Sequence, residues 1–105
     1  MTRIAADRVA PSRVLAVDVD GEEFVLWRAR DGHVCSAPRR CPHLDHDLAE
    51  GYVDGDELVC AGHGWAFDGA GRAFKRNEFG RVDAKGIVEA LRVGERDNEI
   101  ELARA

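Results

Sequence analysis

Residues 22–37, EEFVLWRARDGHVCSA, contain two short apolar runs on either side of an Asp-Gly pair. The run FVLW at 24–27 is rich in aromatic and β-branched residues, which favour strands. Asp31-Gly32 is typical of a hairpin turn, because glycine readily adopts the positive φ that tight turns require. This stretch therefore predicts two antiparallel strands joined by a turn.

The same pattern recurs along the rest of the chain. Short apolar or alternating runs at 52–53, 57–61, 64–68, 86–93 and 99–103 are separated by glycine-containing turns or by Asp97-Asn98. No window shows the 3.6-residue period of a long amphipathic helix. The segment 75–87 has no clear period, and we expect a loop there. The chain is thus predicted to be all-β, a small antiparallel β-sandwich.

The bulk composition limits the classes of protein. The chain has 105 residues, 45% of them apolar, which predicts one globular domain over 1–105. Twenty acidic against fifteen basic residues give a net charge of −5, which argues against nucleic acid as a partner. No apolar run is long enough to span a membrane, and the N-terminus lacks the features of a signal peptide. We expect a cytoplasmic protein that does not bind membranes.

Cys/His pairs occur at two places, each between predicted strands. Cys41 and His43 are one residue apart, and Cys60 and His63 are two residues apart. Thiolate and imidazole ligands suit zinc and iron–sulfur clusters. A Cys2His2 zinc finger places its two cysteines together and its two histidines together, whereas each loop here has one of each. A mixed pair per loop favours a binuclear iron cluster with both thiolates on one iron, and a zinc-stabilised binding module is the alternative.

The two motifs, C-P-H at 41–43 and C-A-G-H-G-W at 60–65, are sixteen residues apart and resemble the Rieske [2Fe–2S] signature. The resemblance covers about residues 22–76. It implies one [2Fe–2S] cluster per chain in a cluster-binding subdomain, about residues 38–68, formed by two loops. The implied ligands are Cys41, His43, Cys60 and His63.

The resemblance also indicates the type of Rieske protein. High-potential members have an extra cysteine in each ligand loop and a serine after the second His-Gly. The matching positions here are His46, Gly62 and Trp65. The sequence therefore resembles the soluble, low-potential type, found as Rieske ferredoxins and as N-terminal domains of ring-hydroxylating oxygenases.

The family implies electron transfer for this chain. We expect a monomeric ferredoxin that carries single electrons from a flavin-dependent reductase to a terminal oxygenase, with no catalytic residues of its own. A terminal oxygenase also needs a mononuclear iron held by two histidines and a carboxylate, and only His33 and His46 remain after the cluster ligands. The alternative is a Rieske component or small subunit of a multi-subunit oxidoreductase, an oxygenase or a nitrite reductase.

Several other side chains can be interpreted from their context. Trp27 and Cys35 are expected in the core, His33 at the surface, and Trp65 and Phe67 over the core beside the cluster. His46 is either a surface residue or a group that tunes the cluster. Residues 44–59 include six Asp or Glu and no Lys or Arg, which indicates a solvated loop and hairpin or, alternatively, a docking face for a basic partner.

Overall fold

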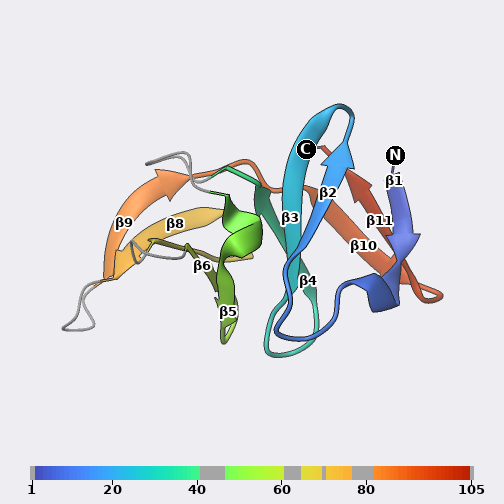
Figure 1. The fold of residues 1–105 in the computed structure, drawn as a ribbon, viewed down its shortest axis with the longest axis horizontal. Helices are drawn as coiled ribbons and strands as arrows, with labels where there is room; N and C mark the ends of the chain where they lie inside the picture. Colours follow the sequence, from blue (N-terminus) through green and yellow to red (C-terminus); the bar gives the residue numbers. More distant parts are fainter. Residues whose placement is uncertain (1, 41–46, 61–64, 70, 77–81, 105) are drawn as a thin grey trace.

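The structure, a computed structural model, describes residues 2–40, 47–60, 65–69, 71–76 and 82–104. These residues form antiparallel strands and two short 3₁₀ helices (Figure 1), which confirms the predicted all-β class. No helix in this part of the chain has the length and apolar character that crossing a membrane requires. The elements are β1 (Thr2–Ala5), η1 (Ala6–Arg8), β2 (Leu15–Val19), β3 (Glu22–Arg28), β4 (Val34–Pro38), η2 (Leu48–Glu50), β5 (Tyr52–Asp54), β6 (Glu57–Val59), β7 (Trp65–Phe67), β8 (Arg72–Arg76), β9 (Val82–Ile87), β10 (Arg92–Arg96) and β11 (Glu99–Ala103).

The strands form three sheets. The terminal sheet has the order β1-β11-β10, the central sheet β2-β3-β4, and the five-stranded sheet β5-β6-β7-β8-β9. The central sheet lies between the other two in Figure 1. Strand β1 pairs with β11, so the first and last strands of the chain are neighbours.

Strand β3 is buried on both of its faces. Phe24 and Leu26 belong to a core shared with the terminal sheet, whereas Val25 and Trp27 belong to a second core shared with the five-stranded sheet. Successive side chains of a strand point to opposite faces, so the unbroken run FVLW supplies both cores in turn. All four side chains are at most 1% exposed, and burying each contributes about 1.5–3 kcal/mol.

The β5–β6 hairpin is fixed to the central sheet by hydrogen bonds to Asp56. The indole N–H of Trp27 donates to the Asp56 carbonyl oxygen at 3.2 Å, and the backbone N–H of Arg30 donates to Asp56 Oδ1 at 2.7 Å. Trp27 is therefore a core residue, as predicted, and it also orients the five-stranded sheet. The hairpin carries β6, which leads directly to Cys60.

Two predicted turns have the expected backbone. Asp20 and Gly21, between β2 and β3, have φ of 54° and 84°, and Asp97 and Asn98, between β10 and β11, have φ of 53° and 63°. Positive φ at both central residues suits a two-residue hairpin, and Asp, Asn and Gly tolerate it best. These residues therefore fix the register of two strand pairs.

The prediction of a loop over 75–87 was wrong for most of its length. Residues 75–76 complete β8, residues 82–87 form β9, and residues 77–81 lie outside the described part. Strand β9 pairs with β8 in a register that shifts between Ala73 and Phe74. An edge strand needs only one partner, and a bulge breaks the period of two, so this strand has no clear signature in the sequence.

The side chain of Arg28 joins three parts of the fold. Its guanidinium donates to the carbonyl oxygens of Ala6 at 2.9 Å and Gly32 at 2.6 Å, and its Nε donates to that of Val9 at 2.6 Å. It also pairs with Glu95 of β10 at 2.8 Å. The Arg28 side chain is only 16% exposed, so these contacts are largely shielded from solvent.

Replacing Arg28 should destabilise the fold strongly. We expect Arg28→Met to lower the free energy of unfolding by about 2–3 kcal/mol, because three carbonyls and a carboxylate lose a charged donor. Denaturant unfolding measures this. The control is Arg3→Met, whose exposed pair with Glu101 at 3.4 Å should contribute less than about 0.5 kcal/mol. Equal effects of the two substitutions would contradict the assigned role of Arg28.

Candidate metal centre

Of the four predicted ligands, the described residues include Cys60. It follows β6 directly, is 1% exposed, and belongs to the core between the central and five-stranded sheets. Cys41, His43 and His63 lie outside the described residues, so their assignment stays a prediction. Within the described part, no group of three or more His, Cys, Asp or Glu side chains could hold a metal. The described residues therefore offer no competing metal site.

The second predicted ligand loop, residues 61–64, lies between two residues that are paired through their backbones and form its stem. The backbone N–H of Cys60 donates to the carbonyl oxygen of Trp65 at 2.7 Å. Next to this bond, β6 and β7 pair with Val59 opposite Ala66. Residues 61–64 therefore connect two positions that a hydrogen-bonded hairpin holds together.

The first predicted ligand loop, residues 41–46, has a comparable stem. Arg40 and Asp47 form an isolated antiparallel bridge, and the backbone N–H of Leu48 donates to the carbonyl oxygen of Arg39 at 2.7 Å. Residues 41–46 therefore also begin and end at paired backbone. The two stems give each Cys/His pair a fixed base.

An ion pair closes the first stem. Arg39 Nε donates to Asp47 Oδ1 and Arg39 Nη2 to Asp47 Oδ2, each at 3.0 Å. Asp47 Oδ1 also accepts the backbone N–H of Ala49 at 2.9 Å and so caps η2. The guanidinium holds the pKa of Asp47 below its usual value, chiefly through these hydrogen bonds. The sequence interpretation missed this pair, because it grouped Asp47 with the solvated acids of residues 44–59.

Both stems rest on the same apolar core. Leu48, which follows the first loop, is 0% exposed and shares this core with Cys60 and with Phe67 of β7. Trp65, at the end of the second loop, is partly buried and packs against it, as predicted. The two predicted ligand loops start from this one core. Their two thiolates and two imidazoles would together be a donor set that fits a binuclear iron–sulfur cluster.

The other cysteine and histidine of the described part have structural roles. Cys35 is 2% exposed in the same core, and burial raises the pKa of its thiol to about 11. It is therefore protonated at neutral pH and acts as a small buried hydrophobe, as predicted. The His33 side chain is 58% exposed and its ring contacts Asp31, which agrees with the predicted surface position. His46 lies outside the described residues.

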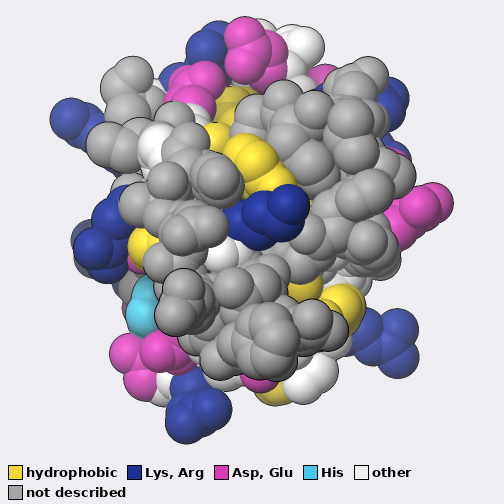
Figure 2. All heavy atoms as spheres, turned by 90° about the vertical axis from the view of Figure 1, so that its left-hand side faces the viewer, with side chains coloured by type: hydrophobic (Ala, Val, Ile, Leu, Met, Phe, Trp, Pro, Cys, Tyr) yellow, Lys and Arg dark blue, Asp and Glu magenta, His cyan; other side chains and the backbone are white. Residues whose placement is uncertain are grey.

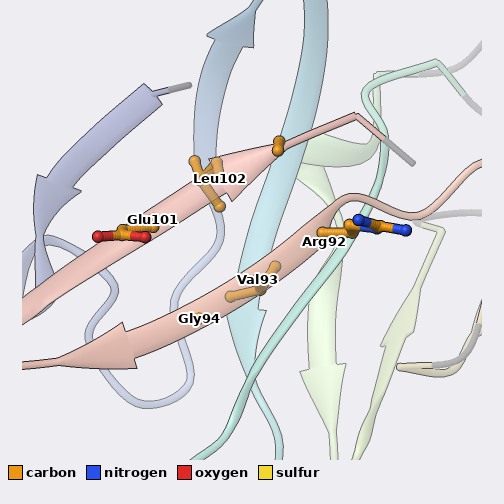
Figure 3. A pocket seen from close by; sticks show the side chains of 6 residues that line it. Arg92, Val93, Gly94, Glu101 and Leu102 are labelled. Carbon is orange, nitrogen blue, oxygen red and sulfur yellow. The ribbon is translucent and has the colours of Figure 1, made fainter.

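A hollow of about 250 Å³ lies on the terminal sheet, between β10 and β11. Its lining includes Arg92, Val93, Gly94 and Leu102, and Glu101 and Arg92 lie at opposite ends of it (Figure 3). The side chains that line the hollow include no hydroxyl, thiol or imidazole group. We assign no catalytic role to this hollow.

Charges of both signs surround the end of the molecule that Figure 2 shows. Acidic and basic described side chains are interspersed there, and a Lys or Arg side chain lies near the middle of the view. The described part of this end is thus not a uniformly acidic patch. The alternative interpretation of residues 44–59, a docking face for a basic partner, stays a prediction.

Comparison with known proteins identifies the family. The model of the Rieske [2Fe–2S] domain matches residues 2–86. A 4beta-methylsterol monooxygenase of Methylococcus capsulatus is 42% identical over 65 residues, which are 62% of this chain and 18% of that protein. The chain therefore spans less than a fifth of this relative.

Solved structures confirm the fold. Dicamba monooxygenase superimposes with a TM-score of 0.82 and 26% identity, over 97% of this chain and 32% of that chain. The ferredoxin of carbazole 1,9a-dioxygenase from Nocardioides aromaticivorans superimposes with a TM-score of 0.73 and 26% identity, over 97% of this chain and 94% of that chain. The chain belongs to the Rieske [2Fe–2S] domain family, whose domains bind a [2Fe–2S] cluster and transfer electrons in oxidoreductase systems.

Proposed function

We propose that this chain is a Rieske-type ferredoxin that carries single electrons from a flavin-dependent reductase to a terminal ring-hydroxylating oxygenase. The observation that carries the proposal is the match with the carbazole dioxygenase ferredoxin, which extends over 94% of that protein. The match with dicamba monooxygenase extends over 32% of that chain.

The described surface also suits a domain that meets its partners transiently. Among the described residues, the one large hydrophobic side chain that is exposed is that of Tyr52, at 57% exposure. A domain packed permanently against another buries an apolar interface, and a lone exposed tyrosine is too small for one. Both apolar cores are completed by residues of this chain. We therefore propose that residues 1–105 form one domain that acts as a monomer. We also propose the cytoplasm as its compartment.

We propose that Cys41, His43, Cys60 and His63 hold the cluster. The bound cluster accepts and releases one electron. Replacing two thiolates of an all-cysteine site by neutral imidazoles removes about two negative charges, so that potentials rise to roughly −150 mV or above, against about −400 mV for plant-type ferredoxins. The protein contributes the two stems, which fix where each Cys/His pair begins, and the core under Cys60, which limits the access of water.

The second candidate function is the Rieske component of an oxygenase. It is favoured by the higher TM-score with dicamba monooxygenase, 0.82 against 0.73. Such an oxygenase also needs a mononuclear iron held by two histidines and a carboxylate. The chain has four histidines, of which the cluster would take two. His33 already contacts Asp31 at the surface, so we assign no catalytic residue to this chain.

Metal analysis and a reductase assay test the proposal together. The purified holoprotein should contain two iron atoms and two labile sulfides per chain and take up one electron. It should also increase the rate at which a flavin-dependent NADH reductase reduces cytochrome c. A third iron per chain, or stable co-purification with a large subunit and no stimulation of the reductase, would favour the oxygenase component. One zinc without sulfide would refute both.

A further inference from the structure

We propose that the Arg39–Asp47 ion pair is a clasp that positions the first ligand loop, so that Cys41 and His43 keep the geometry that retains the cluster. This inference rests on the proposal that these two residues are ligands, and it does not depend on the carrier role. Arg39 and Asp47 stand on either side of the loop in the sequence and are not themselves among the proposed ligands. They are therefore positioning residues.

The clasp has a geometry that fixes the separation of the two loop ends. Two parallel hydrogen bonds of 3.0 Å join the guanidinium to both carboxylate oxygens. This bidentate form is the stronger and more directional type of ion pair. The side chains are 31% and 25% exposed, so solvent screens the pair less than it screens a fully exposed one. The adjacent bridge between Arg40 and Asp47 holds the backbone in the same register.

Each half of the clasp is anchored to a different rigid part of the fold. The backbone N–H of Arg39 donates to the Glu23 carbonyl oxygen at 3.1 Å, which ties it to β3. Asp47 caps η2 through Ala49, and η2 places Leu48 in the core at 0% exposure. The pair thus connects the central sheet, where the loop begins, to the core residue after its end.

The short length of the loop makes this connection important for the ligands. Six residues, 41–46, separate Arg40 from Asp47, and Cys41 is two residues from Arg39. If the stem opened, the loop would gain conformations in which its thiolate and imidazole no longer meet the cluster together. Metal sites depend on such supporting contacts, whose removal costs about 10–100-fold in metal affinity.

The test compares rates of cluster loss in the holoprotein. Asp47→Asn keeps an oxygen to cap η2 but removes the ion pair, Arg39→Met removes the guanidinium, and Arg39→Lys keeps the charge without the two parallel donors. Bleaching of the visible absorption by an iron chelator at neutral pH gives the rate, and spectroelectrochemistry gives the midpoint potential. Arg104→Met is the matched control, because Arg104 makes a similar two-bond pair with Glu89, at 3.0 and 3.2 Å.

Asp47→Asn and Arg39→Met should each bleach about tenfold faster than the wild type, and the double variant should bleach no faster than the worse single one. Arg39→Lys should fall between Arg39→Met and the wild type. The potential should rise in Asp47→Asn and fall in Arg39→Met, since the two remove opposite charges. Faster bleaching in both Asp47→Asn and Arg39→Met would therefore come from a change in the position of the loop and not from the change in charge.

Arg104→Met and Arg28→Met should bleach at the wild-type rate, although Arg28→Met lowers global stability. Fast bleaching in Arg28→Met, wild-type rates in the clasp variants, or multiplied effects in the double variant would overturn the proposal. If Arg39→Met does not fold, Arg39→Lys replaces it: bleaching faster than the wild type supports the clasp, and bleaching at the wild-type rate overturns it. Cys41→Ser distinguishes failure of the ligand assignment from failure of the clasp. If Cys41→Ser retains the cluster, the ligand assignment is wrong. If it loses the cluster while the clasp variants bleach at the wild-type rate, only the clasp proposal is wrong.

Discussion

Cys60→Ser should give a protein without the visible spectrum of a [2Fe–2S] cluster. The hydroxyl of serine is harder and far less acidic than a thiol, so it is a much poorer ligand for an iron–sulfur cluster. Cluster binding and folding are coupled, so we expect the free energy of unfolding to fall by about 4 kcal/mol or more. Absorption spectroscopy, iron analysis and thermal unfolding measure these losses.

The chain contains a matched control for this substitution. Cys35 lies in the same core as Cys60, at 2% against 1% exposure. Cys35→Ser buries a hydroxyl in an apolar site at a cost of about 1–3 kcal/mol, yet it should keep two iron atoms and the full spectrum. If Cys60→Ser retains the spectrum, or if Cys35→Ser loses it, the ligand assignment is wrong.

Gly51→Ala should be among the most destabilising single substitutions outside the ligands. A Cβ at Gly51 would lie 2.4 Å from the Val59 carbonyl oxygen and 3.2 Å from that of Leu48. The backbone at Gly51 is extended, with φ of −76° and ψ of −172°, so the cause is steric and not conformational. Because backbone must move to admit the methyl group, we expect a loss of about 3 kcal/mol or more in the free energy of unfolding.

This substitution should also weaken cluster retention, since Val59 directly precedes Cys60 in the chain. Gly94→Ala serves as the control, because a Cβ there has nothing within 4 Å. It should change stability by less than about 1 kcal/mol, in the stabilising direction. Similar stabilities of the two variants in denaturant unfolding would refute the steric explanation.

The sequence predicts the hairpins because the signals that form them are local. The run FVLW, the Asp20-Gly21 and Asp97-Asn98 turns and the apolar pairs of β5 to β8 act over a few residues, and the structure confirms them. Strand β9 and the division into three sheets could not be read in the same way. They depend on pairing between segments and on which of two cores each face of β3 meets.

The candidate site also has one part that the sequence predicts and one part that it does not. The ligand types and their spacing are visible in the sequence, because the chemistry of the cluster demands them. The stems that support the loops are less visible: an arginine before the first loop and an aspartate after it are ordinary surface residues until the backbone brings them together. An aspartate before Leu48-Ala49-Glu50 is a capping signal, and only this part of the clasp could have been inferred in advance.

The pairing of β1 with β11 has a practical consequence. Because these strands lie side by side in the terminal sheet, with Thr2 opposite Leu102, the first and last strands bring the described ends of the chain close together. The central sheet lies between the terminal sheet and the five-stranded sheet (Figure 1). A tether, whether an engineered fusion or a linker to an electrode, can therefore be joined at either end while the opposite end of the molecule remains open to colliding redox partners.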